Sequence, residues 1–302
     1  MMKSKRNKTI DFSAEEGREY LARCAAPGGE WLDKTILGDT LAALPLLPEG
    51  CAGLVIADPP YNLRKNYAGA VFSPMPDGAY LDYTRRWLAL VRPLLRPDGS
   101  IYVCCDWRCS AAVAAALGEM FTVRSRITWQ REKGRGAARN WKNSMEDVWF
   151  ATVGREYTFH LDAVKVRRKV LAPYRATGRP KDWTEGEGNI KYRDTCPGNF
   201  WDDVTVPYWS MAENTAHPAQ KPEKLLAKLI LASSDPGDTV LDPFLGSGST
   251  SVTAKKLGRH YIGVEQSPQY CAWAEYRLAM AETDKRIQGF EDGVFWERHA
   301  RI

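Results

Sequence analysis

Short apolar runs alternate along most of the chain with segments whose apolar residues recur at helical spacing. Runs that fit buried strands stand at 34–40, 53–61, 97–105, 121–130 and 145–153. Segments that fit helices stand at 41–50, 79–95, 110–120 and 221–234, and 238–265 reads as a strand, a glycine loop, a helix and a strand. This alternation predicts an α/β fold, in which a doubly wound, mostly parallel sheet carries helices on both faces.

The alternating pattern is lost between about 154 and 213. This stretch is rich in Pro, Gly, Arg and Trp and is much longer than an ordinary connection between two elements. Long segments of this kind inside a compact domain usually carry function. We therefore interpret 154–213 as an inserted, partly irregular recognition region.

Composition fits one large α/β domain, or one with a small satellite. The chain has 302 residues, of which 44% are hydrophobic and 26% charged, and its net charge is +5. The basic residues are concentrated: 124–142 holds seven Lys or Arg and one Glu, and 165–181 holds seven Lys or Arg and no acid. Two such segments indicate an anionic partner, and the alternative is a solvated basic surface.

The cysteines and the N-terminus exclude several classes of protein. The seven cysteines are irregularly spaced with no CxxC pair, which argues against a zinc site and fits reduced thiols in the cytoplasm. We expect no metal ion. Residues 1–10 are basic and lack the apolar core of a secretory signal, and no run approaches the roughly 18 apolar residues of a membrane span. We expect a cytoplasmic protein with a basic N-terminal arm.

The first candidate motif ends the predicted strand at 53–61, after the apolar residues Leu54 to Ile56. There an acid, two prolines and an aromatic stand together as Asp58, Pro59, Pro60 and Tyr61. Proline cannot continue a central strand, and a Pro-Pro pair fixes the path of the chain. A plain turn would explain the prolines. It leaves unexplained why a carboxylate and an aromatic ring stand beside such a rigid main chain.

The second candidate motif is the glycine loop Gly246-Ser247-Gly248, which lies between a predicted strand and a helix. Glycines there allow close approach of a ligand to the backbone, and the helix N-terminus offers free N–H groups. Glu265 ends the next strand, 19 positions after Gly246, as does the ribose-binding acid of nucleotide-binding βαβ units. The dinucleotide pattern GxGxxG fails at Ser251 and no P-loop lysine follows, so the pattern favours an adenosine without pyrophosphate, such as S-adenosylmethionine. A plain glycine turn is the alternative.

With these motifs the chain resembles the amino-methylating DNA methyltransferases. Their signature [D/N/S]PP[Y/F/W] stands at 58–61, their HPxxKP at 217–222 and their FxGxG at 244–248. The catalytic motif comes first, the recognition region next and the cofactor loop last, which is the order of the β class. The resemblance covers about 35–280. It implies a Rossmann-like S-adenosylmethionine-dependent fold and DNA as partner. Homodimers are frequent in that class.

The resemblance also implies a division of the chain into five parts. These are an N-terminal arm and lead-in at 1–33, a catalytic half at 34–153, a target-recognition region at 154–213, a cofactor-binding half at 214–282 and a C-terminal tail at 283–302.

The expected reaction is methylation of the exocyclic N6 amine of an adenine that has been flipped out of the duplex. The lone pair of that amine is delocalised into the ring, and acceptors on its N–H groups can free it. Asp58 and the carbonyl of Pro59 would be these acceptors, aimed by the turn at Pro60, and Tyr61 would stack on the base. Flipping costs a few kcal/mol, and stacking on an aromatic returns roughly 1–3 kcal/mol.

The resemblance assigns further residues to ligand sites. Glu265 would bind the ribose hydroxyls, and Lys221 would pair with the methionine carboxylate beside His217. Asp39 matches an acidic position near the adenine or methionine part, although a turn or cap aspartate fits as well. The full expected cofactor set is Asp39, Asp58, His217, Lys221, Asp242, Phe244, Gly246, Ser247, Gly248 and Glu265. The expected DNA contacts are Arg131, Lys133, Arg135, Arg139, Lys142, Arg167, Arg168, Lys169 and Arg175.

Other functions remain as alternatives. Cytosine N4 presents a similar amine, and Asp with Tyr in the motif favours adenine whereas Ser favours cytosine. RNA or protein-glutamine methylation is usually associated with Asn at the position of Asp58. A non-catalytic DNA-binding module predicts loss of Asp58 or of the glycine loop, and both are present. The missing third glycine disfavours a nicotinamide oxidoreductase.

Overall fold

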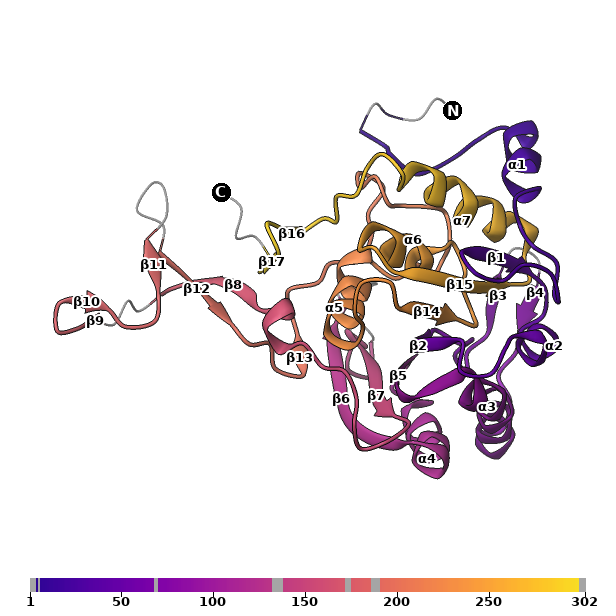
Figure 1. Cartoon of the computed structure of the whole chain (residues 1–302), viewed down its shortest axis with the longest axis horizontal. Helices are drawn as coiled ribbons and strands as arrows, with labels where there is room; N and C mark the ends of the chain where they lie inside the picture. The colour runs from indigo at the N-terminus through magenta and orange to yellow at the C-terminus, as the bar shows by residue number, and fades with distance from the viewer. Residues whose placement is uncertain are drawn as a thin grey trace.

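The central feature of the computed structural model is an eight-stranded sheet with helices on both faces (Figure 1). The structure describes residues 4, 6–67, 70–131, 138–171, 175–185 and 191–298. The strand order is β1-β15-β14-β2-β5-β7-β6-β13, and only the pairings of β7 with β5 and β6 are antiparallel. The α/β fold with a mostly parallel sheet, predicted from the sequence, is confirmed.

The strands of this sheet agree closely with the apolar runs of the sequence, except for β13, which lies within the predicted recognition region 154–213. They are β1 (Lys34–Leu37), β2 (Ala52–Ala57), β5 (Leu95–Cys105), β6 (Thr122–Gln130), β7 (Met145–Thr152), β13 (Phe200–Trp201), β14 (Thr239–Asp242) and β15 (His260–Glu265).

The two faces of the sheet carry two separate apolar cores, which explains why β2 is apolar throughout. Val55 and Ala57 belong to the core under one set of helices, and Leu54 and Ile56 belong to the core under the other. Successive side chains of a strand point to opposite faces, so a strand covered on both sides needs an unbroken apolar run.

The helices divide between these faces. The first core takes side chains from α3 (Asp77–Val91) and α4 (Ser110–Met120), and the second from α5 (Glu223–Ser233), α6 (Ser249–Lys256) and α7 (Pro268–Met280). The remaining helical segments are α1 (Ala14–Leu21), α2 (Thr40–Ala43), η1 (Leu44–Leu46), η2 (Arg92–Leu94) and η3 (Leu161–Val164). A capping box formed by Ser13 and Glu16 begins α1, so the lead-in is partly folded.

The inserted region 154–213 forms part of a second, five-stranded sheet of order β11-β12-β8-β17-β16. Its strands are β8 (Val166–Lys169), β11 (Thr184–Glu185), β12 (Lys191–Thr195), β16 (Phe290–Glu291) and β17 (Val294–Trp296), with a hairpin of β9 (Arg175–Ala176) and β10 (Arg179–Pro180) beyond them. We call residues 165–195 the recognition arm, which projects from the body on the left of Figure 1.

The C-terminal segment is integrated with the arm, a feature that the expected boundary at 283 does not anticipate. Strand β17 pairs in parallel with β8, opposite Val166 and Arg167. Phe295 of β17 is fully buried in a small core with Val164 and Val166. The arm and the segment after 283 therefore share one sheet and one core.

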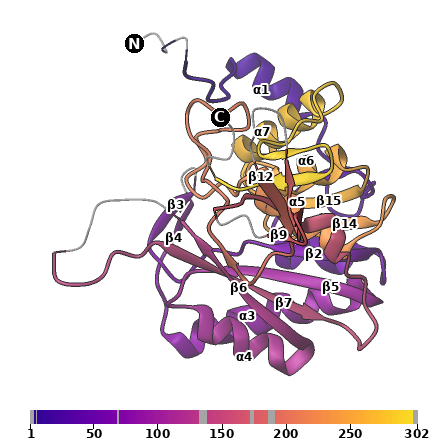
Figure 2. The same cartoon turned by 90° about the vertical axis from the view of Figure 1, so that its left-hand side faces the viewer.

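A small hairpin of β3 (Lys65–Tyr67) and β4 (Ala70–Phe72) follows the first motif. In Figure 2, residues 138–144 return to β7 from a point well outside the central sheet, on the side of this hairpin. This places the segment 138–144 on the same side of the molecule as the β3–β4 hairpin.

Three chemical features of the described residues bear on function. Within them, no helix is long and apolar enough to cross a bilayer. No group of three or more His, Cys, Asp or Glu side chains in the same part of the chain could hold a metal ion. The seven cysteines are free thiols, and Cys196 is the exposed one.

Candidate active site

The two sequence motifs meet at one edge of the central sheet. Neighbouring parallel strands β2, β14 and β15 end there, and their last residues lead into Asp58, the glycine loop and Glu265. In open α/β sheets, ligands bind outside the carboxyl ends of the strands. A cavity of about 260 Å³ lies at this edge, lined by residues of both motifs and of the HPxxKP segment.

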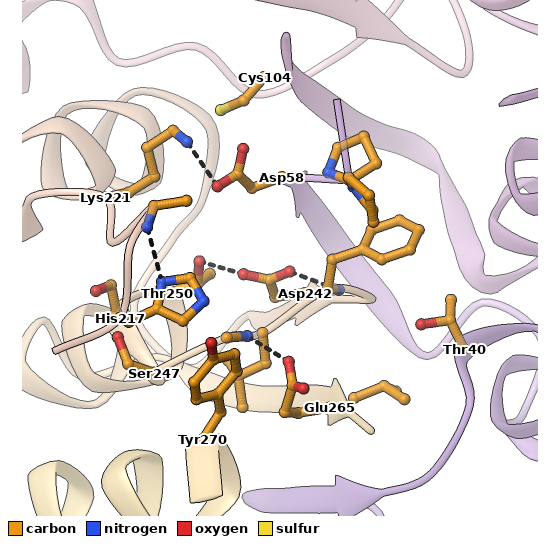
Figure 3. Close-up of a pocket in the computed structure, with 18 of the residues that line it drawn as sticks. Thr40, Asp58, Cys104, His217, Lys221, Asp242, Ser247, Thr250, Glu265 and Tyr270 are labelled. Atoms are coloured by element: carbon orange, nitrogen blue, oxygen red, sulfur yellow. Dashed lines mark hydrogen bonds and ion pairs between the residues drawn. The ribbon is translucent and has the colours of Figure 1, made fainter. Parts of the chain in front are cut away.

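Asp58 has a partner on each carboxylate oxygen. Oδ2 accepts a hydrogen bond from Lys221 Nζ at 2.6 Å, and Oδ1 accepts one from the hydroxyl of Tyr61 at 2.8 Å. Figure 3 shows the side chains of Lys221 and Asp58 pointing toward each other across the cavity. Lys221, expected to pair with a methionine carboxylate, is thus paired with the motif acid in this structure. A carboxylate has about four lone-pair sites, so Asp58 retains capacity for further donors.

Neighbouring residues fix the turn at the prolines. The hydroxyl of Tyr80, on α3, donates to the carbonyl of Pro60 at 3.0 Å. Asn62 accepts from the N–H of Met75 and donates to its carbonyl, each at 2.8 Å. Because the Pro60 carbonyl is bonded to Tyr80, the carbonyl of Pro59 is the better second acceptor for a ligand beside Asp58.

Two charged residues that sequence reasoning missed stand close to this pair. Glu146, on β7, is 2% exposed, and its Oε2 lies 3.4 Å from Lys221 Nζ and 3.3 Å from the Tyr61 hydroxyl. Lys65, on the β3–β4 hairpin, lines the cavity. Burial lowers the pKa of Lys65 to about 8, with Asp58 opposing the shift. A lone Glu within a strand carries no motif, so nothing in the sequence singled out Glu146.

Burial also affects Tyr61. It raises the pKa of the phenol well above its usual range, and the negative charge of Asp58 adds to the shift. Tyr61 therefore keeps its proton, so it serves as a donor to Asp58 and as an aromatic face in the cavity.

The two glycines of the loop have different roles. Gly246 has φ of 57°, and a Cβ there would lie 3.1 Å from His217 Nε2, within the cavity wall. Gly248 has φ of 86°, and a Cβ there would lie 2.6 Å from the Cβ of Ala274 on α7. Gly248 is therefore required for the packing of α6 against α7, and it is the one predicted cofactor residue that does not line the cavity.

Two acids hold the glycine loop and face the cavity. Glu265 accepts from the N–H of Gly246 at 2.9 Å and of Ser267 at 2.7 Å, and Asp242 accepts from Thr250 Oγ1 at 2.5 Å. Burial raises the pKa of Glu265 to about 6 and that of Asp242 to about 7, and these hydrogen bonds oppose the shift. A ligand that donates hydroxyls to Glu265 would favour its charged form.

The other predicted cofactor positions also come together. His217 packs edge-on against Tyr270, with 4.4 Å between ring centroids, and burial lowers the pKa of its imidazole to about 3, so the ring is neutral. Asp39 caps α2 by accepting from the N–H groups of Leu41 and Ala42, and it also lines the cavity. Both the capping interpretation and the ligand-side interpretation of Asp39 are thus compatible with its position.

The residues at this edge fit S-adenosylmethionine chemically. Glu265 and Asp39 supply acceptors for hydroxyl or amine groups, Phe244 supplies an apolar face, and the loop at Gly246 leaves room for backbone approach. Together with Asp58 these groups surround one cavity. The residues that were predicted from the sequence as site residues and that line this cavity are Asp39, Asp58, Pro59, Pro60, Tyr61, His217, Lys221, Asp242, Phe244, Gly246, Ser247 and Glu265.

The expected DNA contacts are only partly compatible with the structure. Arg131 pairs with buried Glu146, and Arg167 makes two hydrogen bonds of 2.8 Å to Asp194 on the neighbouring strand. Arg168 lies 3.4 Å from Asp202. These arginines have acidic partners that a count along the sequence did not include.

The remaining expected contacts are more accessible. Arg139 and Lys142 are exposed, as is Lys169. Arg175 is exposed too, and its guanidinium lies over the ring of Trp183. Lys133 and Arg135 lie outside the described residues.

Comparison with known proteins identifies the family of the chain. A family model described as DNA methylase matches residues 52–276. DNA adenine methyltransferase YhdJ of Escherichia coli is 35% identical over 254 residues, which cover 82% of this chain and 83% of that protein. Type II methyltransferase M.HpaI of Haemophilus parainfluenzae is 32% identical, over 85% of this chain and 76% of its own length.

Solved structures share the fold. The cytosine-N4-specific PvuII DNA methyltransferase superposes with a TM-score of 0.61 at 20% identity and covers 82% of this chain and 89% of its own. A candidate DNA modification methylase of Thermus thermophilus, complexed with S-adenosyl-L-methionine, gives a TM-score of 0.56 at 21% identity, over 88% of this chain and 98% of its own.

Proposed function

Because the chain belongs to the DNA methylase family, we propose that it transfers the methyl group of S-adenosylmethionine to the exocyclic N6 amine of a flipped-out adenine in DNA. The observation that carries this proposal is the placement of Asp58 and Tyr61 in the same cavity as the glycine loop and Glu265. A base held by Asp58 and a nucleoside held by Glu265 would face each other across this cavity.

The cofactor, when bound, supplies a methyl group on a positively charged sulfur, from which an amine can take it in line. The residues of the chain hold and orient the two ligands. Glu265 accepts hydrogen bonds from ribose hydroxyls, and Phe244 covers an apolar part of the adenosine. Gly246 allows the backbone to approach. The buried acids favour a cationic ligand.

The target amine is prepared by acceptors. Asp58 and the Pro59 carbonyl each accept an N–H of the amine, which frees the nitrogen lone pair for attack. Tyr61 stacks on the base and donates to Asp58. The proton lost by the amine passes to Asp58 or to solvent. Positioning and electrostatics supply the rate enhancement, and no covalent bond to the enzyme is formed.

Adenine is proposed over cytosine on two grounds. The motif begins with Asp58 rather than Ser, and YhdJ, at 35% identity, is named a DNA adenine methyltransferase. We also propose that 154–213 serves target recognition, together with the β16–β17 segment that shares its sheet. A homodimer and a cytoplasmic location remain predictions from the sequence.

The test is methyl transfer from radiolabelled S-adenosylmethionine to unmethylated DNA, followed by digestion to nucleosides. We expect the label in N6-methyl-2′-deoxyadenosine. Label in N4-methyl-2′-deoxycytidine would correct the target base. No label in any nucleoside, with DNA of broad sequence content and a protein that binds the cofactor, would contradict the proposed function.

A further inference from the structure

Glu146 is a buried carboxylate beside the proposed reaction site, and it does not itself line the cavity. It stands on β7, and three charged or polar side chains of the described residues contact it. They are Lys221 of the HPxxKP segment, Tyr61 of the first motif and Arg131, which directly follows β6. Burying a carboxylate is costly unless it is paired, and two of the partners here, Lys221 and Tyr61, are also the partners of Asp58.

Glu146 and Asp58 therefore share their donors. Lys221 Nζ lies 2.6 Å from Asp58 Oδ2 and 3.4 Å from Glu146 Oε2. The Tyr61 hydroxyl lies 2.8 Å from Asp58 Oδ1 and 3.3 Å from Glu146 Oε2. Glu146 thus contacts both donors of Asp58 from outside the lining of the cavity.

Charge balance gives this sharing a consequence. Two acids, Asp58 and Glu146, face three bases, Lys221, Arg131 and Lys65. Without the charge of Glu146, Asp58 would be the only anion of this group. Lys221 would then bind it more tightly, and Arg131 would lose its buried partner. Asp58 would then be the anion that both cations attract, which reduces its capacity to accept a hydrogen bond from an incoming amine.

We propose that Glu146 is a positioning residue for methyl transfer, which holds Lys221 and Tyr61 in place against Asp58 and also pairs with Arg131. The proposal rests on the proposed function, because the role of Asp58 does. Glu146 acts through its neighbours and does not contact the substrate.

The adjacent residue provides a matched control. Asp147 is also buried, at 1% exposed, on the same strand. It accepts from Ser110 Oγ at 2.8 Å and Thr128 Oγ1 at 2.9 Å. Its partners belong to α4 and β6, so Asp147→Asn removes a buried charge without touching the residues that contact Asp58.

The first experiment compares Glu146→Gln, Glu146→Asp and Asp147→Asn in methyl transfer. We expect Glu146→Gln to lower kcat at least tenfold while KM for S-adenosylmethionine changes less than twofold. Glu146→Asp restores the charge and should recover part of the rate. Asp147→Asn should lower the melting temperature and keep kcat within about threefold of wild type. Wild-type kcat in folded Glu146→Gln, or an equal loss of kcat in Asp147→Asn, would overturn the proposal.

A second experiment needs no turnover, so it separates this inference from the proposed function. Melting temperatures are measured for Glu146→Gln, Lys221→Met and the double variant. Residues in contact give non-additive effects, so the double variant should melt higher than the sum of the single losses predicts. Additive losses would overturn the positioning role even if wild type methylates adenine. A wild type that methylates no DNA would contradict the proposed function, and non-additive losses would still show that Glu146 and Lys221 are coupled.

Discussion

The cavity and the recognition arm both contain many charged residues, but the charges are arranged in opposite ways. In the cavity the charges are buried and come from distant parts of the chain, as Lys221 and Asp58 do, with side chains 7% and 20% exposed. In the arm the pairs are more exposed and lie on adjacent strands, as Arg167 on β8 and Asp194 on β12 do, at 21% and 31%. Arg193 and Asp182, also in the arm, are about half exposed.

This difference indicates how function is distributed. Removing one partner of a buried pair leaves an uncompensated charge and costs about 3–5 kcal/mol, whereas exposed pairs contribute about 0–1 kcal/mol. A single change in the cavity should therefore abolish either cofactor binding or methyl transfer. Changes on the proposed DNA-binding surface should act by small increments, since binding to phosphates sums over many contacts.

The largest effect is expected from Asp58→Ala. Loss of the acceptor for the target amine should lower the methyl-transfer rate at least about 10²-fold, the size seen when a single stabilising group is removed from an active site. Lys221 keeps Glu146 as a partner and the glycine loop is unchanged, so calorimetry should show cofactor affinity changed much less than turnover. Steady-state transfer of labelled methyl groups to DNA measures the first quantity. A rate within tenfold of wild type would remove Asp58 from the mechanism.

The next effect is expected from Gly246→Val. The positive φ of 57° costs a branched residue roughly 1–3 kcal/mol, and its Cβ would lie 3.1 Å from His217 Nε2. Calorimetry should show that S-adenosylmethionine binding is lost. The matched control is Gly178→Val in the β9–β10 hairpin, where φ is 78° and a Cβ has open space. If the control loses cofactor binding equally, the effect is strain and not a contact with the ligand.

A smaller effect is expected from pH. The pKa of Glu265 in the ligand-free protein is about 6, above its ordinary value of 4.5, because the group is buried. This shift favours the protonated form, so its contribution to folding stability is present below about pH 4.5 and is lost as pH rises through 6. Ribose hydroxyls favour the charged form. Cofactor affinity should therefore increase several-fold between pH 5 and 7, because a hydrogen bond to a charged group contributes about 1.5–3 kcal/mol.

Glu265→Gln is the control for this pH dependence. Calorimetric titrations of the variant should show weaker binding with a flatter dependence, and what remains reports Asp242, whose pKa is about 7. An unchanged pH dependence in Glu265→Gln would assign it to Asp242 instead.

The smallest effect is expected from Arg139→Ala with Lys142→Ala, two exposed residues between β6 and β7. Each phosphate contact releases about one counterion, so the log–log salt slope of DNA binding should flatten by up to about two. Fluorescence anisotropy with labelled duplex measures the slope, and cofactor affinity without DNA should not change. Lys255→Ala, in the last turn of α6, is the control. An unchanged slope in the double variant would exclude these two residues from the DNA surface.

The cavity could be predicted from the sequence because its parts are motifs next to strand ends. Asp58 to Tyr61 and Phe244 to Gly246 each follow an apolar run, and parallel strands bring such ends to one edge. Glu146 could not be predicted in this way. It is one Glu within a strand, and only the pairing of β7 with β5 brings it beside the motif.

The arm was predicted less well for the same physical reason. The run 165–181 contains no acid, but strand pairing places Asp194 beside Arg167, and the fold brings Asp202 to Arg168. The net charge of a segment of sequence therefore differs from the net charge of the surface that the segment forms, because the fold adds acids from other segments. The β17 strand was missed likewise, since its partner β8 lies more than a hundred positions earlier.

The most direct test of the division between cavity and surface is the single-turnover rate of methyl transfer at saturating DNA and saturating S-adenosylmethionine. Saturation removes differences in binding and leaves only the chemical step and the steps coupled to it. The account predicts that the Arg139→Ala, Lys142→Ala variant regains at least half the wild-type rate, whereas Asp58→Ala stays at least about 10²-fold below it. A loop variant as slow as Asp58→Ala at saturation, or an Asp58→Ala rate that approaches wild type, would contradict the account.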